Sequence, residues 1–258
     1  VAQDVGVEEF WRERPLSVSE GCLFPQWNHL RGTHQKRTTL LLEAHETSLL
    51  KNAARAHKVT LNVLMQGVWA LVLSQYHKNK KDIVFGSMMS GRSETLKDVE
   101  DMVGMFINAL PIRVSLDPET NIKDWFQGIQ EEQSRILQYQ HTSLDDIRRW
   151  NSLPKDSSLF DTMVVFQNFK GHEKVNMLLN GDNATISWDS YFEERDPLLT
   201  VEVELSDKIK INLLHPVALE NDFIENSFCS LKEILDMLMN GSAKNIQDLL
   251  RRSYNDAA

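Results

Sequence analysis

The side chains in this sequence that could do chemistry are few and scattered. Its two cysteines are Cys22 and Cys229, and two histidines, His29 and His34, follow the first of them. Cysteine and histidine can hold zinc, but the ligands of known zinc sites recur at short, regular spacings that this group does not have. We therefore interpret Cys22, His29 and His34 as ordinary loop residues rather than as a metal site.

The common sequence signatures of enzymes are also missing. The chain contains no GxSxG, Walker loop, GxGxxG, HExxH or CxxC motif. Asp145 and Asp146 are adjacent, so they point to different sides of the helix predicted there and do not form a facing pair for acid–base catalysis. His57 and His215 lie in predicted regular elements and are interpreted as structural.

The stretch "SGR" is a first candidate for a ligand position. Ser90, Gly91 and Arg92 stand where an apolar run ends. The ends of strands in α/β layers are common ligand positions, whereas a turn with Gly91 at positive φ is the structural alternative. The residues alone leave both interpretations open.

The stretch "MVGMFINALPIR", residues 102–113, is the second candidate. A run without charge until its last residue is expected in a core, yet Asn108 stands inside it. A buried amide left unpaired costs about 1 to 3 kcal/mol. Asn108 must therefore bond either a backbone neighbour or something that enters a cavity, and Arg113 could reach from a strand to a carboxylate.

The elements that must position these stretches follow from the hydrophobic periodicity. Strands are predicted at "TTLLLEA", "DIVFGSMMSGR", "NALPIRVSL", "LFDTMVVFQNF", "ATISWDSYFE", "LLTVEVEL" and "KIKINLLHP". Helices are predicted at "VEEFWRER", "HETSLLKNAARAH", after the N-cap Thr60, from Asn121 to about Tyr139, at "SLDDIRRW", from about Asn221 to Met239, and at "NIQDLLRR". Pro111 indicates an edge strand or a bulge.

Strands and helices in this mixed order predict a layered α/β domain with a mixed sheet. No repeat or linker divides the chain, so we expect a single domain over residues 1–258. Residues 1–37 would form an opening helix and an extended segment, and residues 38–251 the α/β core.

Composition narrows the range of partners. The net charge of -9, with 37 acidic against 28 basic residues, argues against nucleic acid, which requires a basic face. No apolar run approaches the roughly 18 residues of a membrane span, and the first residues lack a signal-peptide core. Two cysteines fit a reducing environment, so a soluble cytoplasmic protein is expected.

Four ordered stretches resemble one known family. "IVFGSMMSGR", "MVGMFINALPIR", "HTSLDDI" and "SSLFDTMVVFQN" are similar to successive motifs in the C-terminal half of a nonribosomal peptide synthetase condensation domain. The similarity extends over residues from about 10 to 250. It implies a chloramphenicol acetyltransferase-like fold, in which two α/β lobes meet in a V and each layers a mixed β-sheet with helices.

The resemblance also implies a reaction. In that family, carrier proteins bring phosphopantetheine thioesters into a tunnel, where an acceptor amine attacks the donor thioester to form an amide. The HHxxxDG motif of its N-terminal lobe has no match here, because the sequence has no His-His pair and no Asp-Gly. We therefore expect a C-terminal lobe that is inactive alone and binds no cofactor directly. Its expected partners are the N-terminal lobe, peptidyl carrier proteins and an adjacent adenylation domain.

Matching the motifs residue by residue assigns expected roles. The residues that would line the substrate tunnel are Asn108, Ser90, Gly91, Arg92 and Met105. Those with structural or interlobe roles would be Arg113, Arg37, His141, Gln167 and Asn168. Arg37 would pair with the aspartate of the HHxxxDG motif.

His141 keeps only the first residue of a family motif written HQDxPFE, so a plain helix-entry role stays open for it. Two other functions also remain open. One is a non-catalytic platform that docks carrier proteins or tailoring enzymes, and the other is an ester-forming relative.

Overall fold

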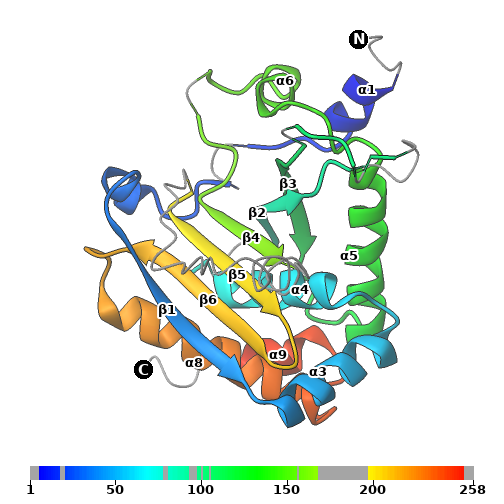
Figure 1. Cartoon of the computed structure of the whole chain (residues 1–258), viewed down its shortest axis with the longest axis vertical. Helices are drawn as coiled ribbons and strands as arrows, with labels where there is room; N and C mark the ends of the chain where they lie inside the picture. The colour runs from blue at the N-terminus through cyan, green and yellow to red at the C-terminus, as the bar shows by residue number, and fades with distance from the viewer. Residues whose placement is uncertain are drawn as a thin grey trace, which may run out of the picture.

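A six-stranded mixed sheet organises the part of the chain that the structure describes (Figure 1). The computed structural model describes residues 6–17, 21–77, 81–92, 98–99, 101–104, 106–155, 157–167 and 197–252. The strands are β1 (Gln35–Leu42), β2 (Asp82–Met89), β3 (Asn108–Ser115), β4 (Thr162–Gln167), β5 (Leu199–Leu205) and β6 (Ile209–Pro216), in the order β1-β6-β5-β4-β2-β3. Strands β2, β4 and β5 run parallel, and the other neighbours pair antiparallel.

The helices are α1 (Val7–Arg12), α3 (Ala44–His57), α4 (Leu61–Gln75), α5 (Ile122–Leu137), α6 (Leu144–Trp150), α8 (Asn221–Met239) and α9 (Ile246–Arg252), with a 3-10 helix η1 (Pro25–Leu30). Helix α4 is the centre of the core, because every residue from Val63 to Ser74 is buried. Alternate residues of β5 and β6 share its hydrophobic cluster, so one face of the sheet packs on α4 and α8. This arrangement confirms the predicted mixed α/β layering.

Helix ends match the sequence prediction closely. The side chain of Thr60 accepts from the N–H of Val63, and the side chain of Asn121 accepts from that of Lys123, so both cap their helices as expected. Helix α8 begins and ends at the residues predicted. Pro111 lies in β3 at the edge of the sheet, where its missing N–H is tolerated.

The segment before β1 differs from its prediction as a loop or extended linker. Residues 25–30 form η1, and Leu23 and Phe24 are buried. The strand itself starts at Gln35, three residues before the predicted start, because Gln35 pairs with Pro216 of β6. Long-range pairing thus ordered residues whose local sequence is polar. The strand predicted at 184–193 lies outside the described residues. In the part of the chain that the structure describes, no helix is long and apolar enough to cross a membrane.

Candidate functional site

One end of the sheet collects most of the candidate residues. Because β2, β4 and β5 are parallel, their carboxyl ends lie at the same edge, which is the usual ligand edge of an open α/β sheet. Ser90 follows β2, Gln167 ends β4, and Asn108 begins β3 opposite Met89. The structure therefore brings together three stretches that are far apart in sequence.

The "SGR" stretch anchors the loop between β2 and β3. Gly91 has φ of 65°, and a Cβ placed on it would lie 1.6 Å from the carbonyl oxygen of Phe106. Arg92 donates from Nη2 to the carbonyl of Met102 at 3.1 Å and from Nη1 to that of Val99. Its guanidinium also lies 4.6 Å from the ring centre of Phe106. The structure thus shows the turn with Gly91 at positive φ that was the alternative for this stretch.

Asn108 bonds to backbone neighbours, which was one of the two alternatives left by the sequence. Its Nδ2 donates to the carbonyl oxygens of Gln140 and Thr142, both at 2.8 Å. Its Oδ1 accepts from the N–H of Ala109 at 3.0 Å. The amide therefore joins the start of β3 to the turn between α5 and α6. Both of its N–H donors are hydrogen-bonded, as is usual for a partly buried amide.

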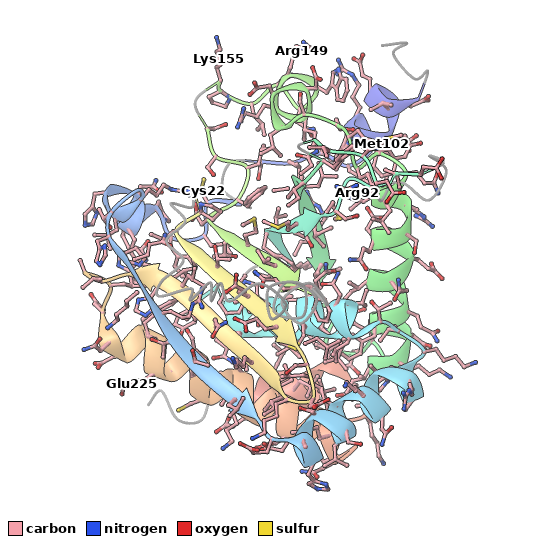
Figure 2. The ribbon with its side chains drawn as sticks, viewed as in Figure 1. Cys22, Arg92, Met102, Arg149, Lys155 and Glu225 are labelled. Atoms are coloured by element: carbon pink, nitrogen blue, oxygen red, sulfur yellow. The ribbon has the colours of Figure 1, made fainter. Side chains whose placement is uncertain are left out.

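The loop held by Arg92 exposes apolar side chains. Val103 is fully exposed, Ile107 is 58% exposed and Met102 is 44% exposed. Figure 2 shows Arg92 and Met102 close to each other, near one end of α5. Large apolar side chains that gather on a surface mark interaction sites in soluble domains. Met105, the remaining predicted tunnel residue, lies outside the described residues, as does Asn168.

Arg113 lies towards the other end of β3, away from Asn108. Its Nη1 lies 3.3 Å from Oδ2 of Asp82 at the start of β2, and its Nη2 donates to the carbonyl of Pro15. The reach from a strand to a carboxylate is as the sequence predicted. The bond to Pro15 ties the amino-terminal segment to the edge strand β3.

Arg37 and Gln167 meet at a residue that the sequence interpretation missed. The carboxylate of Glu202 accepts from Gln167 Nε2 at 2.6 Å, and its Oε2 lies 3.2 Å from Nη2 of Arg37. Asn212 Nδ2 donates to the same carboxylate at 3.4 Å. Glu202 is 2% exposed, although alternation in "TVEVEL" indicates a solvent face. The sequence signal for this buried site would have been an acidic residue in a strand that lies inside the sheet, with a neighbouring strand on each side.

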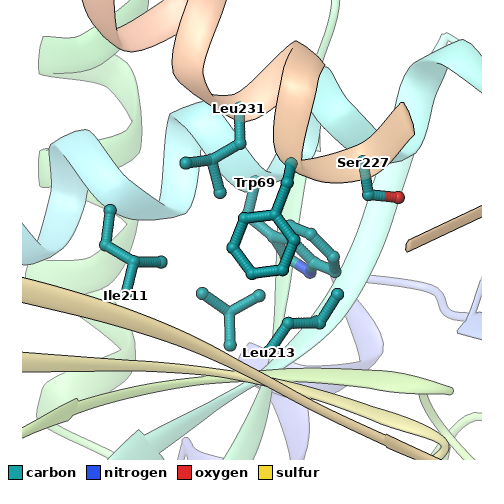
Figure 3. A pocket seen from close by; sticks show the side chains of 7 residues that line it. Trp69, Ile211, Leu213, Ser227 and Leu231 are labelled. Carbon is teal, nitrogen blue, oxygen red and sulfur yellow. The ribbon is translucent and has the colours of Figure 1, made fainter. Parts of the chain in front are cut away.

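An open groove and a small apolar pocket lie in the described chain, and neither is lined by Ser90, Asn108 or Gln167. The open groove, of about 340 Å³, lies between β3 and α5 and is lined by Arg113, Asp124, Trp125 and Gly128 among others. The small apolar pocket, of about 10 Å³, lies between α4, α8 and the sheet, beside Trp69 and Leu231 (Figure 3). Among the described residues there is no group of three or more His, Cys, Asp or Glu that could hold a metal ion.

Known proteins share both the sequence pattern and the fold. The family model "Condensation domain" matches residues 6–255. A protein of linear gramicidin synthase from Brevibacillus parabrevis is 34% identical over 251 residues, which cover 94% of this chain and 3% of that protein. A holo four-domain nonribosomal peptide synthetase bound to AMP and glycine superimposes with a TM-score of 0.75 at 18% identity, over 96% of this chain and 20% of that one.

A variant of the starter condensation domain of rhizomide synthetase, in complex with C8-CoA, superimposes with a TM-score of 0.70 at 18% identity, over 96% of this chain and 55% of that one. This chain thus spans a small part of the gramicidin synthase protein and about half of the starter-domain structure. The shared fold confirms the predicted chloramphenicol acetyltransferase-like architecture. On the family match, which extends over nearly all its residues, the chain belongs to the condensation domain family of nonribosomal peptide synthetases.

Proposed function

We propose that this chain is the C-terminal lobe of a condensation domain, a single domain that works with an N-terminal lobe outside this sequence. The sequence has no His-His pair, so the proton-transfer group comes from that other lobe. Coverage of about half of the starter condensation domain supports this division. On this proposal the chain is inactive alone.

The reaction is amide formation between two carrier-bound thioesters. The acceptor amine attacks the donor thioester carbonyl, the C–N bond forms, the C–S bond breaks, and the thiol leaves on the donor carrier. This lobe contributes walls and orientation, which are worth several kcal/mol as effective molarity. Phosphopantetheine arrives on peptidyl carrier proteins, and the starter domain solved with C8-CoA supports a thioester site in this fold. The setting is the cytoplasm, beside an adenylation domain.

The observation that carries the proposal is the loop at the ligand edge of the sheet. Arg92 and Gly91 hold this loop, which exposes the apolar side chains of Met102, Val103 and Ile107 just before Asn108 in the chain. Such a surface is suited to contact the second lobe and the thioester arm. Arg37 lies on β1, the other edge strand, and is bound to Glu202, so it would reach the second lobe only through its exposed part.

The test is reconstitution with the N-terminal lobe and two carriers loaded with aminoacyl groups, with mass spectrometry of the carrier-bound product. A dipeptidyl thioester on the acceptor carrier is expected. A product only with a hydroxyacyl acceptor would indicate the ester-forming relative. No product with either acceptor, despite carrier binding, would favour the non-catalytic platform.

A further inference from the structure

Asn108 uses both hydrogens of its side-chain amide on a single turn. The two carbonyls that it bonds belong to Gln140 and Thr142, the residues on either side of His141. A neutral amide nitrogen carries two hydrogens, and both are taken here. Asn108 therefore cannot donate to a ligand without releasing the turn.

The same turn is held from a second direction by α1. Trp11 Nε1 donates to Thr142 Oγ1 at 3.2 Å, and that hydroxyl donates to the carbonyl of Tyr139 at 2.8 Å. The N–H of Thr142 also donates to Tyr139, at 3.0 Å. Two side chains from distant parts of the chain thus fix the backbone around His141.

His141 is the side chain that this turn displays. It is exposed, although Gln140 and Thr142 on either side are buried. Among the described residues its imidazole has no hydrogen-bond partner. The turn meets Asn108 directly after Ile107, so the imidazole belongs to the same end of the sheet as the exposed apolar loop. A side chain that binds a ligand must be held in place by supporting hydrogen bonds, and the backbone of His141 has such support.

We propose that Asn108 is a positioning residue that acts through His141, and that the His141 imidazole hydrogen-bonds a secondary amide of the substrate. This inference rests on the proposed function, because the secondary amides concerned belong to the pantetheine arm and to a peptidyl donor. Neutral imidazole can donate from one nitrogen and accept at the other, which suits an amide. The residue that sequence resemblance assigned to the tunnel wall thus acts one step away from the substrate.

The first experiment uses the 258-residue chain alone, with histidine labelled for NMR. Asn108→Ala should shift or broaden the ring resonances of His141. Asn245→Ala is the control, because Asn245 also binds backbone, accepting from the N–H of Asp248 at 3.0 Å, and it lies beside the start of α5, whereas this turn follows the end of that helix. It should lower stability and leave the His141 resonances in place. Equal effects of both variants would overturn the positioning role.

Titrations with small probes then identify which secondary amide His141 binds. Pantetheine alone and N-acetyl-leucine methylamide alone are titrated into the wild-type chain, and the His141 ring resonances are followed. A shift with pantetheine assigns the arm, and a shift only with the methylamide assigns the peptidyl donor. No shift with either probe would overturn the contact.

The last experiment uses the reconstituted two-lobe protein. Asn108→Ala and His141→Ala should each slow amide formation about three- to tenfold, the equivalent of one hydrogen bond. Because Asn108 acts through His141, the double variant should be no slower than His141→Ala. Multiplied effects would mean that Asn108 touches the substrate itself. A wild-type protein without activity would instead contradict the proposed function, and the NMR result would stand apart from it.

Discussion

The guanidinium of Arg31 pairs with the carboxylate of Asp161, whose side chain is completely buried. The second carboxylate oxygen accepts from the N–H of Phe24 at 2.7 Å. The pair therefore fixes the η1 segment to the start of β4, within the family-like stretch "SSLFDTMVVFQN". Because the buried Asp161 carboxylate has both partners within the protein, we assign this contact a structural role.

Asp161→Asn should lower the free energy of unfolding by about 3 kcal/mol, because it removes the negative charge of a buried ion pair. Urea unfolding measures the effect. Glu8→Gln is the control, since Glu8 and Arg12 form a pair at 2.7 Å with side chains 53% and 56% exposed. That exposed pair should be worth less than about 1 kcal/mol. Equal costs would contradict a structural role for Asp161.

Gly91→Ala should displace the loop between β2 and β3. The added Cβ would overlap the carbonyl of Phe106, and φ of 65° would be strained as well. Hydrogen exchange should be faster at Asp101 and Met102, whose N–H groups donate to the carbonyls of Asp98 and Val99 in this loop. Gly32→Ala separates the two causes, because Gly32 has φ of 68° and open space around its Cβ. Gly32→Ala should lower the free energy of unfolding by only about 1 kcal/mol. If Gly91→Ala lowered it by the same amount, the carbonyl of Phe106 would not be the obstacle.

Gly128→Ala should stabilise the chain. Gly128 lies inside α5 with nothing near an added Cβ, and an exposed helical glycine costs about 1 kcal/mol relative to alanine. Gly67→Ala is the matched comparison in α4, where the Cβ would lie 2.5 Å from Phe126 and 3.0 Å from Trp125. It should destabilise. Thermal unfolding measures both, and the same sign for both variants would contradict the packing described.

Stability should fall as the pH drops below about 6.5. Burial lowers the pKa of His215; the hydrogen bond to the carbonyl of Pro216 acts in the opposite direction, and the positive charge of Lys36 lowers the pKa further. The pKa of His57 is also lowered, first by burial and then by the positive charge of Lys123. Below the ordinary pKa the unfolded chain binds a proton that the folded chain does not, so the folded state loses stability there and is unaffected above it.

Urea midpoints at about pH 7.5 and about pH 5.5, on either side of the ordinary histidine pKa, test this dependence. His215→Gln should reduce the difference between the two midpoints, because the replaced imidazole, bonded to Thr38 Oγ1 at 3.1 Å, no longer resists protonation. An unchanged difference would show that His215 does not contribute.

The sequence by itself determined the features that depend on neighbours along the chain. Thr60 and Asn121 begin their helices because a side-chain oxygen three or two residues away can satisfy a free N–H, and the bounds of α8 follow from its apolar spacing. Pro111 indicated an edge because it lacks a donor. The family motifs identified the fold for the same reason, since their residues and order can be read directly.

Only the tertiary structure decided which distant groups meet. Asn108 finds its partners 32 and 34 residues away, and Gly91 is required by Phe106 across a loop. Glu202 lies in a strand whose alternating pattern predicts that its side chain faces solvent. The strand order instead places it between Gln167 and Asn212, where it is buried. Register and strand order depend on the packing of the whole sheet, which no local pattern encodes.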